Sequence, residues 1–194
     1  MKKYIAEFFG TFALTLAVGL SLNGNFPVST PVLAGLVVML FVYTVGHISG
    51  THINPALTIG AWSIKKITNY DALFYLISQF IGGAIALVVI TMTVGMPHLS
   101  PLNNWTTVFA EGLGTLFFGF GVASVIYGKA PSDLSGVVAG GSLTLGIAIA
   151  ALIGSYGVLN PALAFGIGTF NLAYIFAPII GSVLGMQAYK YLIE

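Results

Sequence analysis

The feature that most constrains this chain is the segment 8–64, which contains no lysine, arginine, aspartate or glutamate. Three further uncharged segments follow, at 72–110, 112–128 and 134–189. A helix that crosses a bilayer needs about 20 apolar residues, so these segments have room for six spans. Because 57% of the residues are hydrophobic and only 6% are charged, a soluble core of this size could not bury the apolar surface. The sequence predicts an all-α membrane protein.

Six spans are predicted from the apolar blocks that lie between Gly, Pro, Asn and charged residues. Each must be helical, because backbone polar groups in hydrocarbon have to be satisfied within the segment. The first block is expected to be a retained span and not a cleaved signal, since Glu7 interrupts its start and no A-x-A site follows. The predicted spans cover 4–23, 30–48, 70–94, 105–127, 134–154 and 172–192.

Two apolar stretches, 54–64 and 160–169, are only about half a span long, roughly 15 Å at 1.5 Å per residue. Both open with the tetrad NPAL. Proline suits the first position of a helix and the preceding asparagine suits its cap, so each tetrad predicts a helix start. The asparagine NH2 groups are then expected to be free and to face a common lumen. The two boxes are Asn54, Pro55, Ala56 and Asn160, Pro161, Ala162.

All the cationic side chains are lysines, and with the amino terminus inside they fall on one side of the predicted spans. The loops assigned to the other side, near 24–29, 95–104 and 155–159, carry no charge. By the positive-inside rule, both termini are expected in the cytoplasm of a multi-pass plasma-membrane protein. The half-length stretch after Asn54 then enters from the cytoplasm and the one after Asn160 from outside. The six lysines are Lys2, Lys3, Lys65, Lys66, Lys129 and Lys190.

The two halves of the chain repeat. AEFFGTF at 6–12 matches AEGLGTL at 110–116, and the NPAL tetrads match as well. Three spans per half is an odd number, so the second copy is inverted in the membrane. We therefore predict one channel domain, 1–194, built from inverted repeats at about 1–97 and 101–194. Its half-helices meet with both positive dipole ends at the bilayer centre, which disfavours cations.

The loops before the half-helices, HISGTHI and GSYGVL, are non-helical at membrane depth. Such backbone is tolerated only where it lines a water-filled cavity, and its carbonyl groups can accept hydrogen bonds from a polar solute. The interrupted helices therefore predict a pore. For His52, a packing role is an equally good interpretation. The candidate lining residues are Gly50, Thr51, His52, Ile53, Tyr156, Val158 and Leu159.

Apart from Asp71, the second residue of its predicted span, Glu7 and Glu111 are the only carboxylates that fall within predicted spans. Ionisable groups at such depth are costly and usually functional. We expect each to accept hydrogen bonds from the amides of the re-entrant loop that enters from its own side. Two alternatives stay open: an acidic residue in a first helical turn, favoured by the helix dipole, or a proton relay.

AEFFGTF, GHISGTHINPALTIG, AEGLGTL and GVLNPALAFGIG together resemble the aquaporin or major intrinsic protein family of channels, essentially from end to end. The resemblance implies a right-handed bundle of six transmembrane helices and two re-entrant half-helices, with a pore in each protomer of a homotetramer. It implies passive passage of water or small uncharged solutes. The family's paired asparagines fall on Asn54 and Asn160, and its loop-bracing glutamates on Glu7 and Glu111.

The chain departs from that family at the narrowest point of the pore. Where the family usually has an arginine, three residues after the second asparagine, this chain has Leu163, and it contains no arginine at all. A wide, apolar filter follows, which admits solutes of glycerol size or larger. If neighbouring side chains narrowed this apolar filter, water would instead leave it and the pore would close. The four filter positions are expected at Ala34, Ala148, Gly157 and Leu163.

Several functional classes remain as rivals to a passive channel. A coupled secondary transporter also uses broken helices, a non-conducting structural membrane protein would keep the scaffold alone, and a weakly selective ion pore would lack the barrier to cations. The sequence has no nucleophile with its base, no metal-ligand cluster, no phosphate loop and no cysteine. It therefore predicts no enzyme and no metal or other cofactor, and a net charge of +1 gives no indication of nucleic-acid binding.

Overall fold

The computed structural model describes residues 1–23, 27–100 and 102–194. Part of the predicted loop 24–29, and Pro101, where the second repeat is predicted to begin, lie outside the described residues. Within them, six helical segments are long and apolar enough to cross a membrane. They are α1 (Lys2–Asn23), α2 (Thr30–Ser49), α4 (Asn69–Thr93), α5 (Trp105–Ile126), α6 (Ser135–Ile153), which follows the short 3-10 turn Ser132–Leu134, and α8 (Leu172–Ile193).

The two half-length helices are α3 (Pro55–Ser63) and α7 (Pro161–Gly166). The six spans agree with the predicted ones to within two residues at each end. Helix α7 is shorter than predicted, because Gly168 adopts a left-handed φ of 80° and the Thr169 amide donates back to the Ala164 carbonyl. That turn ends the helix before 169.

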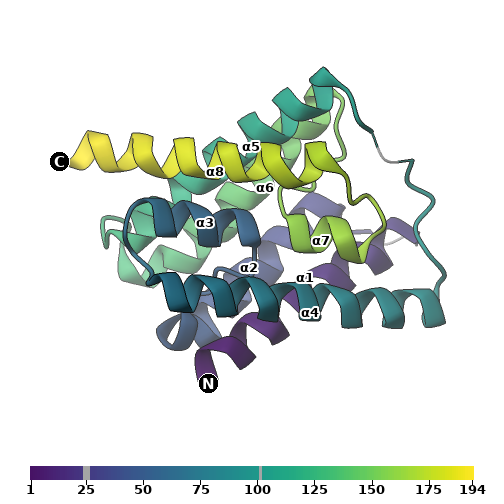
Figure 1. Cartoon of the computed structure of the whole chain (residues 1–194), viewed down its shortest axis with the longest axis horizontal. Coiled ribbons are helices and arrows are strands. Elements are labelled where there is room, and N and C mark those ends of the chain that lie inside the picture. The colour runs from purple at the N-terminus through teal and green to yellow at the C-terminus, as the bar shows by residue number, and fades with distance from the viewer. Residues whose placement is uncertain (24–26, 101) are drawn as a thin grey trace.

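The half-helices lie in the interior of the bundle. Figure 1 shows α3 and α7 between the long helices α4 and α8, approaching each other from opposite ends of the molecule. Helix α3 packs against α4 and α8, and α7 packs against α4 and α1. Both chain termini lie at the end from which α3 enters (Figure 1). This is the all-α architecture of six spans and two re-entrant half-helices that the sequence predicts.

The long helices approach one another closely where glycines face a neighbouring backbone. Helix α1 packs along α4, and its repeat counterpart α5 packs along α8. A Cβ atom added at Gly82 of α4 would lie 2.6 Å from the Phe8 carbonyl oxygen of α1, and one added at Gly181 of α8 would overlap the Gly112 carbonyl oxygen of α5. Small residues at such crossings let backbones touch, as is usual where lipid supplies no hydrophobic drive between helices.

Candidate permeation pathway

Each half-helix begins at its Asn-Pro box, and the asparagine side chain caps it. Asn54 Oδ1 accepts a hydrogen bond from the Ala56 amide at 2.8 Å. Asn160 Oδ1 accepts from the Ala162 and Leu163 amides at 3.0 and 3.2 Å. Each side chain thereby satisfies amides that a helix leaves without an internal partner.

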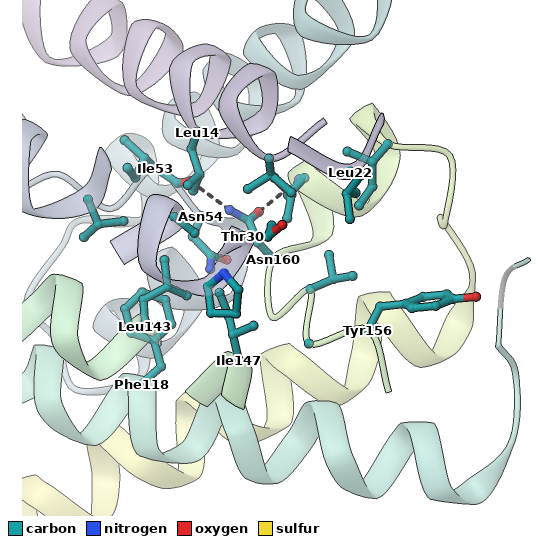
Figure 2. Close-up of a pocket in the computed structure, with 18 of the residues that line it drawn as sticks. Leu14, Leu22, Thr30, Ile53, Asn54, Phe118, Leu143, Ile147, Tyr156 and Asn160 are labelled. Atoms are coloured by element: carbon teal, nitrogen blue, oxygen red, sulfur yellow. Dashed lines mark hydrogen bonds between the residues drawn. The ribbon is translucent and has the colours of Figure 1, made fainter. Parts of the chain in front are cut away.

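The two asparagines also bind each other's loop. Asn54 Nδ2 donates to the Leu159 carbonyl at 2.9 Å, and Asn160 Nδ2 donates to the Ile53 carbonyl at 3.0 Å. Figure 2 shows the two amides side by side, next to Ile53. The sequence predicts free NH2 groups, and in this respect it is partly wrong, because each uses a hydrogen on the opposite loop. An amide NH2 has two donor hydrogens, so one per asparagine remains for the conduit.

Backbone strain places the two accepting carbonyls. Ile53 and Leu159, each directly before its asparagine, have left-handed φ values of 39° and 54°. For a β-branched residue such as isoleucine this conformation is a genuine outlier. Thr51 and Gly157, three residues before the asparagines, are also left-handed, at 51° and 67°. The two loops therefore follow the same path, and strain of this kind tends to collect at functional sites.

Glu7 holds the first loop in that conformation. Its Oε1 accepts from Ser49 Oγ at 2.7 Å and from the His52 amide at 2.9 Å. Its Oε2 accepts from the Ile53 amide and from Gln79 Nε2, the latter at 2.8 Å. Glu7 is 0% exposed, so these four donors replace the water that a carboxylate would otherwise require.

Glu111 is placed in the same way against the second loop. Its Oε1 accepts from Ser155 Oγ and from the Val158 amide, the latter at 3.0 Å. Its Oε2 accepts from the Leu159 amide at 2.7 Å. It too is 0% exposed. The contacts of both glutamates are those expected of residues that brace the re-entrant loops.

A cavity of about 240 Å³ reaches the asparagine pair. Figure 2 shows Phe118, Leu143 and Ile147 together on one wall, while Leu22 and Tyr156 lie farther from the two amides. Among its described lining residues no side chain is a lysine or a carboxylate, and the polar ones are few. Its lining is Leu14, Val18, Leu22, Thr30, Pro31, Ala34, Val38, His52, Ile53, Asn54, Leu99, Phe118, Leu143, Ile147, Ala151, Tyr156, Gly157, Val158, Asn160, Leu163 and Ile167.

Comparison with known proteins agrees with this geometry over nearly the whole chain. The profile of the family described as Major intrinsic protein matches residues 1–189. The chain belongs to the major intrinsic protein family. Its sequence is similar to aquaporin AqpM of Methanothermobacter thermautotrophicus, at 28% identity over 98% of this chain and 97% of that protein. It is also similar to aquaporin NIP1-1 of Arabidopsis thaliana, at 30% identity over 98% and 73%.

The fold is also shared with a solved structure. The aquaglyceroporin from Plasmodium falciparum superposes with a TM-score of 0.72, covering 99% of this chain and 96% of that one at 21% sequence identity. This major intrinsic protein is a multi-pass membrane channel for passive movement of water and small uncharged solutes, and it is not an enzyme.

Three of the four predicted filter positions line the cavity of this major intrinsic protein, namely Ala34, Gly157 and Leu163. Ala148 does not, so its placement is corrected. It lies in a groove between α2 and α6 with residues such as Gly35 and Met39, and Ile147 lines the cavity in its place. One residue of offset turns a helical side chain by about 100°, which is enough to move it from the conduit to another face. The larger Ile147 therefore takes the place of Ala148 among the residues that line the cavity.

The predicted loop residues divide into those that line the pathway and those that support it. His52, Ile53, Tyr156 and Val158 line the cavity, and Gly50 lines a second cavity on the other side of His52. Thr51 is buried and its Oγ1 donates to the Phe41 carbonyl, while Leu159 is buried and supplies its carbonyl group. Buried box residues that contribute structure without lining either cavity are Pro55, Ala56, Pro161 and Ala162.

Sequence reasoning missed the apolar wall and part of the bracing network. Phe118 and Leu143 sit in helices that are apolar on nearly all sides, so no periodic pattern distinguishes a pore-facing position from a lipid-facing one. Gln79, which the sequence gives no site, donates through Nε2 to Glu7 and to Thr58 Oγ1 at 2.8 and 2.9 Å. A glutamine within a span was a usable signal, because a buried amide needs partners.

Proposed function

We propose that this channel selects small neutral solutes, including glycerol-like and larger ones, at an apolar ring formed by Ala34, Ile147, Gly157 and Leu163. The observation that carries the proposal is the cavity lining: apolar side chains on most sides and the asparagine pair at the inner end. A neutral solute can exchange its hydration for the two amide donors and the loop carbonyls. An ion cannot, since losing its water without charged or metal partners is far more costly.

The small residues of the ring support passage of solutes larger than water. Gly157 has no side chain and Ala34 adds one methyl group, while Leu163 stands where an arginine would give charge and bulk. Ile147 is the largest of the four and narrows the opening. We expect glycerol and urea to pass, and we expect permeability to fall through the series of longer polyols.

Stopped-flow light scattering of proteoliposomes tests the proposal against sucrose, glycerol, urea and larger polyols. Leu163→Arg should lower the permeability of glycerol and larger solutes more than that of water, because it adds bulk and charge to the ring. Leu152→Arg is the matched control, since Leu152 is 89% exposed on α6 and lines no conduit. If Leu163→Arg leaves every permeability unchanged, the ring is misplaced.

Cation exclusion is expected to be weaker than in a channel with a filter arginine but not lost. The positive ends of α3 and α7, with the donors of Asn54 and Asn160, face the conduit and disfavour cations. Protein-dependent proton flux as large as the water flux, measured in the same proteoliposomes, would contradict this. Large electrical currents would favour the alternative of an ion pore.

A coupled transporter is the second candidate, and the contacts of the two glutamates argue against it. Both are taken up by loop amides and hydroxyl groups, so neither is left to bind and release a driving ion. Uphill solute uptake driven by a steep pH gradient would favour the transporter. A protein that passes no solute at all would support the non-conducting alternative.

Orientation and assembly belong to the same proposal. We infer a homotetramer in the plasma membrane, with both termini in the cytoplasm and a conduit in each copy. The two termini lie at the same end of the molecule (Figure 1), and this supports that orientation, as does the one-sided distribution of the lysines in the sequence. The matching loop conformations support one domain of inverted repeats at about 1–97 and 101–194. Native mass spectrometry from detergent tests the tetramer, and protease access to tags at the termini tests the orientation.

A further inference from the structure

A second cavity, which we call the inner vestibule, shares His52 with the cavity at the asparagine pair. It has a volume of about 500 Å³. Among the described residues, His52 is the one that lines both this vestibule and the outer cavity. We take the vestibule as the continuation of the proposed conduit on the side that carries the lysines. Its lining is Lys3, Ser49, Gly50, His52, Lys65, Lys66, Ile67, Thr68, Asp71, Tyr75 and Ile126.

The charge of the vestibule is positive, because three lysines and one aspartate line it. Lys3 Nζ donates to Asp71 Oδ2 at 2.8 Å, so that carboxylate is already engaged. Lys66 Nζ lies 4.1 Å from the centre of the Tyr127 ring, which holds it at the end of α5. Within the part of the chain that the structure describes, neither Lys65 nor Lys66 forms an ion pair with a carboxylate.

Lys65 has a backbone conformation that a lysine rarely adopts. Its φ is 60°, in the left-handed region where a side chain is disfavoured and glycine is not. Lys65 follows α3, and the turn closes with two bonds: the Lys65 amide to the Trp62 carbonyl and the Lys66 amide to the Ala61 carbonyl. The first residue after the cap is the position that glycine usually takes at such helix ends.

Other helix ends in this chain provide a direct comparison. The ends of α5, α6 and α7 close with the same pair of hydrogen bonds. In each, one amide donates to the carbonyl three residues earlier, and the next amide along the chain donates to the carbonyl five residues before it. There the left-handed position is Gly128, Gly154 and Gly168, with φ of 63°, 111° and 80°. Among these four described turns, the one facing the vestibule carries a lysine. Strain retained at one site and avoided at its equivalents indicates a local function.

We propose that Lys65 is a specificity-determining residue that keeps cations out of the conduit, with Lys3 and Lys66 contributing to the same field. The inference rests on the proposed function, because it concerns the inner entrance of that conduit. Positive charge on the walls of a vestibule lowers the local concentration of cations and leaves neutral solutes unaffected. The lysines at the inner end thus supply the positive charge that the outer ring, which has no arginine, lacks.

The effect of one charge can be bounded. Consider a cation about 8 Å from the lysine ammonium group. Removing that group raises cation entry about 2-fold if the dielectric constant is that of water, and about 30-fold if the effective dielectric constant is about 20. At low ionic strength, where screening is weak, we therefore expect Lys65→Gly to raise potassium flux by about 2-fold or more and Lys65→Glu to raise it further. Glycine also relieves the left-handed strain, so the variant should fold as well as the parent.

The experiment measures potassium flux and water permeability on the same proteoliposomes. Lys65→Gly and Lys65→Glu are compared with Lys65→Arg, which keeps the charge, and with Lys129→Gln. Lys129 follows the equivalent turn after α5 but does not line the vestibule, so it controls for general surface charge. In about 1 M salt, where the screening length falls to about 3 Å, Lys65→Gly and parent should converge.

The expected result is raised potassium flux in the glycine and glutamate variants, with water permeability equal to that of the parent and both control variants unchanged. Unchanged potassium flux in a water-conducting Lys65→Gly protein would overturn the inference alone, as would an equal rise in Lys129→Gln. A parent that conducts neither water nor glycerol would refute the proposed function first, and the inference with it.

Discussion

Replacing Glu7 by glutamine should destabilise the first re-entrant loop by a predictable amount. In the parent, two carboxylate oxygens accept from Ser49, His52, Ile53 and Gln79. Glutamine keeps one oxygen and replaces the other by an NH2 group, which cannot accept. The Ser49 hydroxyl can rotate, and the Gln79 amide can turn its Oε1, which has no partner among the described residues. A backbone amide of His52 or Ile53 cannot move away, so one stays unpaired.

The magnitude follows from that count. A buried donor left without a partner costs about 1–3 kcal/mol, and the surviving bonds weaken because a neutral acceptor replaces a charged one. We expect Glu7→Gln to lower the free energy of unfolding by about 3 kcal/mol. Glu111→Gln should cost a similar amount, because it leaves the Val158 or Leu159 amide unpaired in the same way.

Unfolding by SDS titration in mixed micelles, followed by the fluorescence of Trp62 and Trp105, measures the change. Glu194→Gln is the control, because this exposed carboxylate forms a surface pair with Lys190 at 3.7 Å, and such a pair is worth about 0–1 kcal/mol. Glycerol permeability should fall in Glu7→Gln as the strained loop relaxes. A Glu7→Gln protein within about 0.5 kcal/mol of the parent, with full permeability, would refute the bracing role.

Two further changes test the helix packing and the filter. Gly82→Ala should destabilise the protein by about 1–3 kcal/mol, because the added Cβ would lie 2.6 Å from a carbonyl oxygen of α1. The control is Gly141→Ala, whose Cβ would meet nothing within 4 Å, so it should be neutral or stabilising by up to about 1 kcal/mol. The same SDS titration distinguishes the two variants. Ile147→Ala should raise the permeability of polyols larger than glycerol in stopped-flow assays, whereas Ala148→Gly should not, and the reverse outcome would restore Ala148 to the ring.

Much of the fold could be predicted because the signals are local. Hydrocarbon requires helices of about 20 residues, so uncharged runs bounded by glycine, proline and lysine give the spans to within two residues. The Asn-Pro boxes predict helix starts for an equally local reason, since a side chain two or three residues away satisfies the first amides. The two glutamates stand out because a carboxylate inside a span requires a partner.

The rest depends on how the helices rotate and approach one another. The sequence could not show that Ile147, and not Ala148, lines the cavity. A helix that is apolar on all sides has no pattern from which the face toward the conduit can be predicted. Nor could the sequence show that each asparagine amide binds the opposite loop, since those partners are far apart in the chain and meet only when the half-helices do. The sequence by itself determined where helices begin, end and cross the membrane. Only the tertiary structure decided which side chains share the conduit. These side chains come from segments far apart in the sequence, and the distance between two segments along the chain does not determine how close they lie in the folded protein.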